Sequence, residues 1–404
     1  MPVALSSRPE LTLLRTVARV ELIPSEQDLL HNLLAGPLDW EHLLDLAFWH
    51  GLEPLLFLHL NQYAAGTVFP KIMQALRQLC KTIARNNLIL ASNLQSISAQ
   101  LRSRKIEHIV YKGPLLAVVY YGNCGLRVSC DLDIIVPPQK LEAARDALGE
   151  IGFSDKKGLN AAQQAASFRF GFEHTFVAAG GLDLELHWGV VPKYISPSLD
   201  MAGIWKRVKM APFFNCEVPT FCPEDLLVAL CLHAGQHEWI QLSHFCDIAQ
   251  LLLVHPQLDW DIVRSHLGDS NTTRTVYVSL RLLHQHWRAQ IPEEMMARIS
   301  ADQHVVHLAD RIQTQLWPST GSVLRQVKSN LRWLLDRSSG EDVGDRLRFL
   351  EGTILTPTLD DFELFKLPKI LVALYPGLRA LRLVCKYISS WRRLVAALRV
   401  PPLS

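Results

Sequence analysis

The chain has 404 residues, of which 49% are hydrophobic and 20% charged, a balance typical of a folded globular protein rather than a disordered one. Its formal net charge of +2 argues against a dedicated nucleic-acid binder, because such proteins usually carry a large positive excess. A secretory signal pattern, C-x-x-C cysteine spacing and a long uninterrupted apolar stretch are all missing, so we expect a cytoplasmic protein without a transmembrane span.

The segment 1–104 is predicted to be an N-terminal helical region. Leu43, Leu44 and Ala47 recur at helical spacing, and apolar residues repeat every three to four positions over 73–101. The periodicity therefore predicts helices and no strand before the chain reaches residue 105.

The segment 105–222 is predicted to form an α/β core with a small sheet. A short strand-like run at 106–110 is interrupted by Lys112, Gly113 and Pro114. Proline directly after glycine suits the first turn of a helix, so these residues indicate a strand-to-helix turn.

Three further extended stretches are expected within this core. Residues 131–136 form a strand candidate, and an amphipathic helix follows over 140–151. Residues 168–177 are aromatic and β-branched, and 182–190 alternate apolar with other residues after a double-glycine turn at 180–181. The last two stretches are predicted to pair as a hairpin.

The segment 223–404 is predicted to be a C-terminal helical region with a basic tail. From Leu364 onward the chain has eight basic residues and no acidic one. A solvated helix face packed on the body is one interpretation of this tail, and contact with an anionic partner such as a membrane or nucleic acid is the other. Helices are expected over Glu224–His233, Ser243–Val254 and Asp259–His266, and a loop over Gln315–Ser322.

Pairs of acidic residues separated by one position are the candidates for chemistry. Chance alone gives about four such pairs and the chain has six, so the spacing by itself is weak evidence. Four pairs lie at expected helix starts or turns, where acids cap helices. Only Asp131/Asp133 and Asp183/Glu185 lie in strand-like segments, where alternate residues share one face.

If these two segments are neighbours in one sheet, up to four carboxylates share a surface. Such a cluster repels itself without a cation, and its oxygen ligands suit Mg²⁺ or Mn²⁺. Shared carboxylates holding two metals are the arrangement that phosphoryl or nucleotidyl transfer needs. Lys112 and Gly113 would suit a phosphate, and Arg127 is a second candidate phosphate or base contact.

Several motifs occur in the order of a known family: Lys112-Gly113, Arg127, Asp131-x-Asp133 and Leu184-Glu185-Leu186-His187-Trp188. They resemble the uncharacterised nucleotidyltransferase family of the DNA polymerase beta-like superfamily. Similar motifs continue at Pro223-Glu224-Asp225-Leu226-Leu227, His237-x-Trp239, Asp247-Ile248-Ala249 and Leu374-Tyr375-Pro376, so the resemblance covers most of the chain. It implies an α+β fold in which a small mixed-sheet nucleotidyltransferase core is flanked by helical regions.

The resemblance also implies the roles of the site residues. Asp131 and Asp133 would ligate both Mg²⁺ (or Mn²⁺) ions, and Glu185 would be the third metal ligand and the general base. A nucleoside triphosphate such as ATP would be the co-substrate. From the residues themselves, the candidate nucleotide-binding positions are Lys112, Gly113, Arg127 and His187. The Lys112-Gly113 turn lies farther ahead of Asp131 than the glycine turn of better-known superfamily members.

Several alternatives stay open. The acceptor is a small molecule, a peptide, a protein or an RNA, and fold-level similarity does not choose among them. A catalytically inactive module that binds a protein or peptide is the rival from another class. A zinc hydrolase using His233 and His237 is the third, although residue 234 is not the glutamate that such motifs carry. His187 either contacts substrate or pairs structurally with a carboxylate, and the role of Asp247 is undecided.

Overall fold

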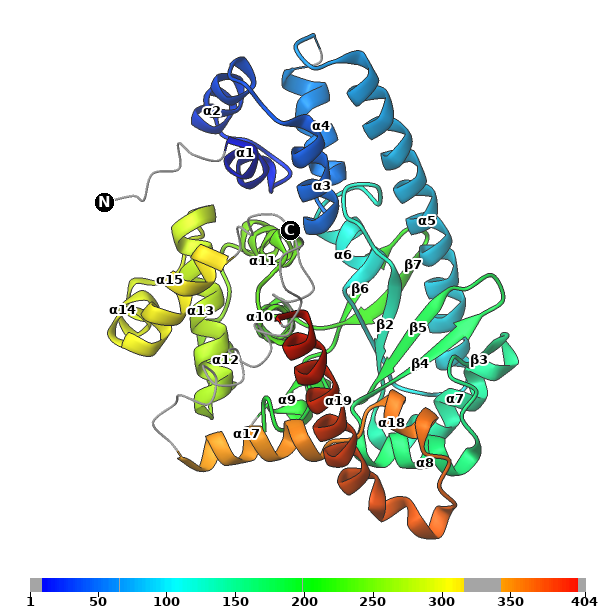
Figure 1. Cartoon of the computed structure of the whole chain (residues 1–404). Coiled ribbons are helices and arrows are strands. Elements are labelled where there is room, and N and C mark those ends of the chain that lie inside the picture. The colour runs from blue at the N-terminus through cyan, green and yellow to red at the C-terminus, as the bar shows by residue number, and fades with distance from the viewer. Residues whose placement is uncertain (1–8, 65, 198, 316–342, 399–404) are drawn as a thin grey trace.

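The structure, a computed structural model, describes residues 9–64, 66–197, 199–315 and 343–398. It is a mixed α+β protein built around one five-stranded sheet and one two-stranded sheet. The sheets and the long helix α5 (Pro70–Ser103) lie on one side of the molecule, and the helices of residues 223–315 gather on the other (Figure 1).

The five-stranded sheet has the strand order β1-β2-β5-β4-β3. Its strands β2 and β5 are parallel, and the remaining neighbours are antiparallel. The predicted small sheet is therefore present, and it is mixed. Its strands are β1 (Ile109–Tyr111), β2 (Asp131–Ile135), β3 (Phe153–Asp155), β4 (Glu173–Ala178) and β5 (Asp183–His187).

One face of this sheet is apolar because of the alternation within its central strands. Leu132 and Ile134 of β2 are buried in the same apolar cluster as Leu184 and Leu186 of β5. The long helix α5 covers them with an apolar stripe at helical spacing, which includes Leu94. Each fully buried side chain of this kind contributes roughly 1.5–3 kcal/mol, so the cluster fixes which face of the sheet remains for polar side chains.

Short helices and a second hairpin, formed by β6 and β7, complete this part of the chain. Thr220 Oγ1 donates a 2.7 Å hydrogen bond to the Val110 carbonyl and so ties the hairpin to β1. The elements are α6 (Gly113–Val119), η2 (Pro138–Lys140), α7 (Leu141–Glu150), α8 (Ala161–Phe170), α9 (Met201–Lys206), β6 (Lys209–Phe213) and β7 (Cys216–Thr220).

The helices before α5 and those after β7 share a second, larger apolar cluster. Leu13, Leu43 and Leu56 from the first helices lie in it with Leu227 and Leu280 from the later ones. The division of the chain at residues 104 and 222 stays a prediction. The first helices are α1 (Pro9–Val17), α2 (Pro24–Ala35), α3 (Trp40–His50) and α4 (Glu53–Tyr63). The later ones are α10 (Pro223–Gln236), α11 (Leu242–Val254), α12 (Trp260–Ser265), α13 (Ser270–Trp287), α14 (Glu293–Ala301) and α15 (Gln303–Gln315).

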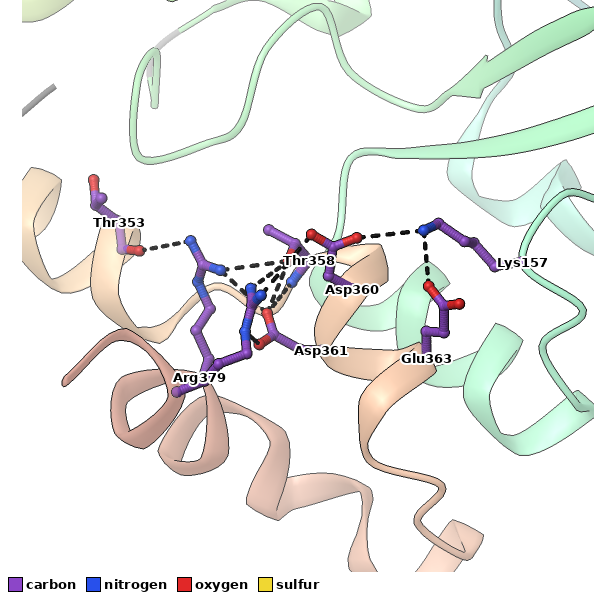
Figure 2. Close-up of polar contacts among 8 residues, drawn as sticks. Lys157, Thr353, Thr358, Asp360, Asp361, Glu363 and Arg379 are labelled. Carbon is purple, nitrogen blue, oxygen red and sulfur yellow. Dashed lines mark hydrogen bonds and ion pairs between the residues drawn. The ribbon is translucent and has the colours of Figure 1, made fainter. Parts of the chain in front are cut away.

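The last described segment packs against α8. It contains α17 (Val343–Leu355), α18 (Leu359–Leu364), η3 (Lys369–Leu374) and α19 (Tyr375–Leu398). Figure 2 shows Asp361 of α18 beside Thr358 and Arg379. Arg382 pairs with the same carboxylate. Asp361 is fully buried, so its charge is compensated by the two guanidinium groups rather than by water.

The four acid pairs that were predicted to be structural do lie at helix starts. Asp39 caps α3 by accepting from the His42 amide, and Asp259 caps α12 in the same way. Glu26 and Asp361 each accept from the backbone amide before their helix, as acids of a capping box do.

One predicted extended stretch is partly wrong. Residues 168–170 belong to α8, and strand β4 begins only at Glu173. Asn160 starts this helix with a capping box that includes Gln163, whose amide also donates to the Phe362 carbonyl about 200 residues away. Local capping and a distant contact outweigh the aromatic pattern here. The hairpin itself is confirmed, since β4 and β5 are antiparallel neighbours.

Two further predictions concern the chain as a whole. The loop expected over Gln315–Ser322 lies outside the described residues except for Gln315, which ends α15. Among the described helices, none combines the length and the apolar character that a membrane crossing requires.

Candidate active site

Two neighbouring strands carry the acidic residues of the candidate site. The register of β2 and β5 pairs Asp131 with Asp183 and Asp133 with Glu185. Directly paired residues point to the same face of a sheet, so the four carboxylates lie together on the face opposite the apolar cluster. The prediction that the two acid pairs are neighbours in one sheet is confirmed.

Three of the side chains on this face bring potential ligand atoms together. One atom each of Asp133, Glu185 and His187 lies within 4.8 Å of the other two, and no other His, Cys, Asp or Glu group in the described part of the chain has this geometry. His187 Nε2 is 3.1 Å from Asp133 Oδ1 and 3.5 Å from Glu185 Oε2. Two carboxylates and an imidazole at these distances fit a divalent metal ion.

Asp131 and Asp183 differ in their surroundings although they are paired in register. Asp183 forms an ion pair with Lys156 and is not one of the three grouped ligands. Besides burial, the negative charges of Asp133 and Glu185 raise the pKa of Asp131, so Asp131 is electrostatically coupled to the grouped carboxylates. Asp183 is therefore a matched acid on the same face with a partner of its own.

Lys112 is directed at the carboxylates. Its Nζ lies 2.9 Å from Asp133 Oδ1 and 3.4 Å from His233 Nδ1, and 4.8 Å above the ring of Tyr111. The residue has a φ of +61°, which is uncommon outside glycine, and Gly113 follows with a φ of +51°. The strand-to-helix turn predicted here thus exists, and its strained backbone aims the ammonium group into the site.

The pKa values show how strongly these charges are coupled. Burial acts to raise the pKa of Asp133, but the Lys112 ammonium and the His187 hydrogen bond outweigh it and hold the value at about 2. Burial acts to lower the pKa of His187, yet its bonds to Asp133 and Glu185 raise the value to about 9. Burial together with the neighbouring carboxylates raises the pKa of Asp131 to about 6.

At pH 7, Asp133 is therefore ionised between two cations, Lys112 and His187. Burial acts to lower the pKa of Lys112 as well, and the charge of Asp133 more than offsets it. Both cations offset the charge of Asp133 and so reduce the repulsion among the carboxylates. A divalent ion at Asp133 would take over the same electrostatic role.

Arg127 is held by a buried acid from the helical region. Its Nε and Nη2 each lie 2.8 Å from an oxygen of Asp247, and Tyr121 donates a 2.7 Å hydrogen bond to the same carboxylate. Its Nη1 faces the Gly113 carbonyl at 3.4 Å. The sequence did not decide the role of Asp247; in the structure this residue is the ion-pair partner of Arg127. Phosphate binding by Arg127 stays a prediction.

Three histidines lie near Lys112: His233 of α10, His237 directly after this helix and His244 of α11. The ring centres of His233, His237 and His244 lie 4.6–5.5 Å apart. Burial and nearby positive charge lower the pKa of each, so all three are neutral at pH 7. They are not among the grouped potential ligands described above, and the zinc hydrolase alternative gains no support from them.

Glu173 is a residue of the site that the sequence patterns did not single out. It is paired in register with His187 across the β4–β5 hairpin, and its Oε2 lies 3.5 Å from His187 Nδ1. Burial raises the pKa of Glu173, while the charge of His187 opposes that rise. The predicted double-glycine turn did not contain this signal, because a two-residue turn at 180–181 would place His174 opposite His187, whereas the observed register pairs Glu173 with it.

A small mixed sheet with acidic residues in register on two parallel strands defines a nucleotidyltransferase-like class of protein. Residues 36–288 match the family described as uncharacterised nucleotidyltransferase, and the chain belongs to that family. The match contains all the predicted site residues. No curated protein matches the chain. One similar solved structure is an antigenic nucleotidyltransferase-like protein from Paracoccidioides brasiliensis, at 14% identity over 51% of this chain and 93% of that chain, with a TM-score of 0.32.

Proposed function

We propose that the protein is a Mg²⁺-dependent nucleotidyltransferase that moves a nucleoside monophosphate from a nucleoside triphosphate, such as ATP, to a hydroxyl-type acceptor. The observation that carries the proposal is the register that sets Asp133 beside Glu185 on parallel strands, with Asp131 on the same face. The family of the chain supports the reaction class. The acceptor stays unidentified among small molecules, peptides, proteins and RNA.

Asp131 and Asp133 are the residues that would hold the divalent ions, and Glu185 would complete the set. Bound ions of this kind neutralise the triphosphate and lower the pKa of an attacking hydroxyl. Burial of Asp133, at 3% side-chain exposure, keeps its charge unscreened, so it binds a cation more strongly than a surface acid does. Glu185 is more exposed, at 31%, and so accessible to an acceptor.

In the proposed reaction, the acceptor oxygen attacks the α-phosphorus and a new phosphorus–oxygen bond forms. The bond between the α-phosphorus and the bridging oxygen breaks, and pyrophosphate leaves with that electron pair. Glu185 receives the acceptor proton as general base. Lys112 supplies positive charge to the phosphates, and Gly113 lets the backbone approach them.

A direct test is incubation with each α-labelled triphosphate, Mg²⁺ and a cell extract, followed by asking which fraction gains the label. Asp133→Asn should abolish the labelling. The matched control is Asp183→Asn, which removes an acid of the same face that is paired with Lys156. Wild-type protein that labels no fraction with any triphosphate would contradict catalysis.

An inactive binding module is the second candidate, and one observation favours it. Lys112 Nζ already lies 2.9 Å from Asp133 Oδ1, so the Asp133 carboxylate has a cationic partner within the protein itself. A triphosphate with Mg²⁺ should raise the melting temperature of the transferase and leave that of the binding module unchanged. Asp131→Ala should remove the shift if the transferase proposal holds.

We also propose an anionic partner for the basic tail, but some of its basic residues already have partners within the protein. Arg379 and Arg382 both pair with Asp361, so a helix face packed on the body accounts for these two residues. Lys366 is exposed and remains a candidate contact.

A further inference from the structure

His187 follows Glu185 on β5 at the spacing that puts both side chains on one face of the strand. Its Nε2 points at the two carboxylates, 3.1 Å from Asp133 Oδ1 and 3.5 Å from Glu185 Oε2. Adjacent ligands around an octahedral ion with bonds of ~2.1 Å lie roughly 3 Å apart. The nitrogen is thus spaced from the oxygens as a fellow ligand of one ion would be.

The other ring nitrogen of His187 lies near a carboxylate, that of Glu173. His187 Nδ1 is buried without a hydrogen-bond partner, and Glu173 Oε2 is the carboxylate oxygen 3.5 Å away. A histidine that binds a metal through one nitrogen almost always donates its other N–H to such a group, which fixes the tautomer. Tyr111 and Phe172 contact the ring at centre distances of 5.9 and 6.0 Å and hold its orientation.

We propose that His187 is a nitrogen ligand of the metal ion and that Glu173 is the positioning residue that orients it. The proposal rests on the proposed function for the presence of an ion at Asp133 and Glu185. Imidazole suits first-row transition ions, whereas Mg²⁺ takes oxygen ligands. The site therefore selects a divalent transition ion such as Mn²⁺ over Mg²⁺, although both support binding of the triphosphate.

A purely structural histidine would donate to Asp133 and never contact the ion. The two roles differ in one spectroscopic signature, because nitrogen nuclei bound to Mn²⁺ modulate its electron spin echo. We therefore propose to titrate Mn²⁺ into the full-length protein, without nucleotide, and to record the echo modulation for unlabelled protein and for protein labelled with ¹⁵N-histidine.

The expected result is an imidazole modulation that changes with the isotope and disappears in His187→Gln. The same variant should weaken Mn²⁺ binding by ~10–100-fold and Mg²⁺ binding by less, and Glu173→Gln should weaken Mn²⁺ binding by about 10-fold. His237→Gln is the matched control, since it removes a histidine near the site that is not among the grouped potential ligands and should retain the signal. If His187→Gln fails to fold, the isotope-sensitive modulation of the wild-type protein still tests whether a histidine binds the ion.

Bound Mn²⁺ without nitrogen modulation in the wild-type protein would overturn the proposal. Equal losses of Mn²⁺ and Mg²⁺ affinity in His187→Gln would overturn the selectivity. If instead only the proposed function is wrong, the protein would show the nitrogen signal but transfer no label from any triphosphate. Label transfer without a nitrogen signal would instead refute the ligand role of His187 alone.

Discussion

Replacing Asp247 with asparagine tests whether the buried pair with Arg127 links the sheet to the helical region. The Asp247 side chain is 3% exposed and that of Arg127 is 14% exposed. Three hydrogen bonds reach the carboxylate, two from Arg127 at 2.8 Å and one from Tyr121 at 2.7 Å. Breaking a buried pair by removing one partner costs roughly 3–5 kcal/mol, because the remaining charge is left without compensation.

Asparagine keeps one accepting oxygen, so we expect Asp247→Asn to lower the free energy of unfolding by about 2–3 kcal/mol, the cost of losing charge-assisted hydrogen bonds. Asp247→Ala should reach the full ~3–5 kcal/mol. Urea unfolding followed by circular dichroism measures both values. Combining Asp247→Asn with Arg127→Met should cost less than the sum of the single changes, because the double variant leaves neither buried charge behind.

The matched control is Glu294→Gln, which removes an exposed ion pair with Arg298 on α14 at 2.9 Å. Such a pair contributes only ~0.3–0.5 kcal/mol, so this variant should unfold almost as the wild type does. A loss for Asp247→Asn as small as that of Glu294→Gln would refute the reasoning. Strict additivity in the double variant would refute it as well.

Three further outcomes are expected. Burial raises the pKa of Glu53 from its ordinary 4.5 to about 7. The fold therefore loses stability as pH rises from 4.5 to about 7, because over this range only the unfolded chain is ionised at this residue. Glu53→Gln should flatten that decline in unfolding experiments over the same pH range. Asp361→Ala leaves Arg379 and Arg382 without their shared acid, and α18 should become sensitive to limited proteolysis while α5 does not. Gly113→Ala places a side chain at a φ of +51°, which should cost about 1–2 kcal/mol and lower the melting temperature.

The strands of the candidate site were predictable because their patterns are local. Asp131 and Asp133 alternate with buried apolar residues, and a period of two fixes which side chains share a face. The double glycine at 180–181 predicted the turn of the β4–β5 hairpin for an equally local reason, since both residues adopt positive φ. The aromatic run at 168–170 misled because helix capping and tertiary contacts determine its conformation.

The partners of the charged residues were not predictable in this way. Arg127 and Asp247 are separated by 120 positions, and Lys112 meets His233 across 121. The sequence offered Lys112 and Arg127 as phosphate contacts, whereas in the structure both also compensate buried acids. A positive side chain looks the same in a sequence whether its partner is a ligand or a distant carboxylate.

The sequence by itself determined the acid pairs, their shared face within each strand and the family to which the chain belongs, because these follow from local alternation and motif order. Only the tertiary structure decided that β2 lies parallel to β5 with Asp133 opposite Glu185, and that Glu173 stands behind His187. The physical reason is register: a shift of one residue would turn every side chain of a strand to the other face, and the buried leucines of both strands fix which alignment is stable.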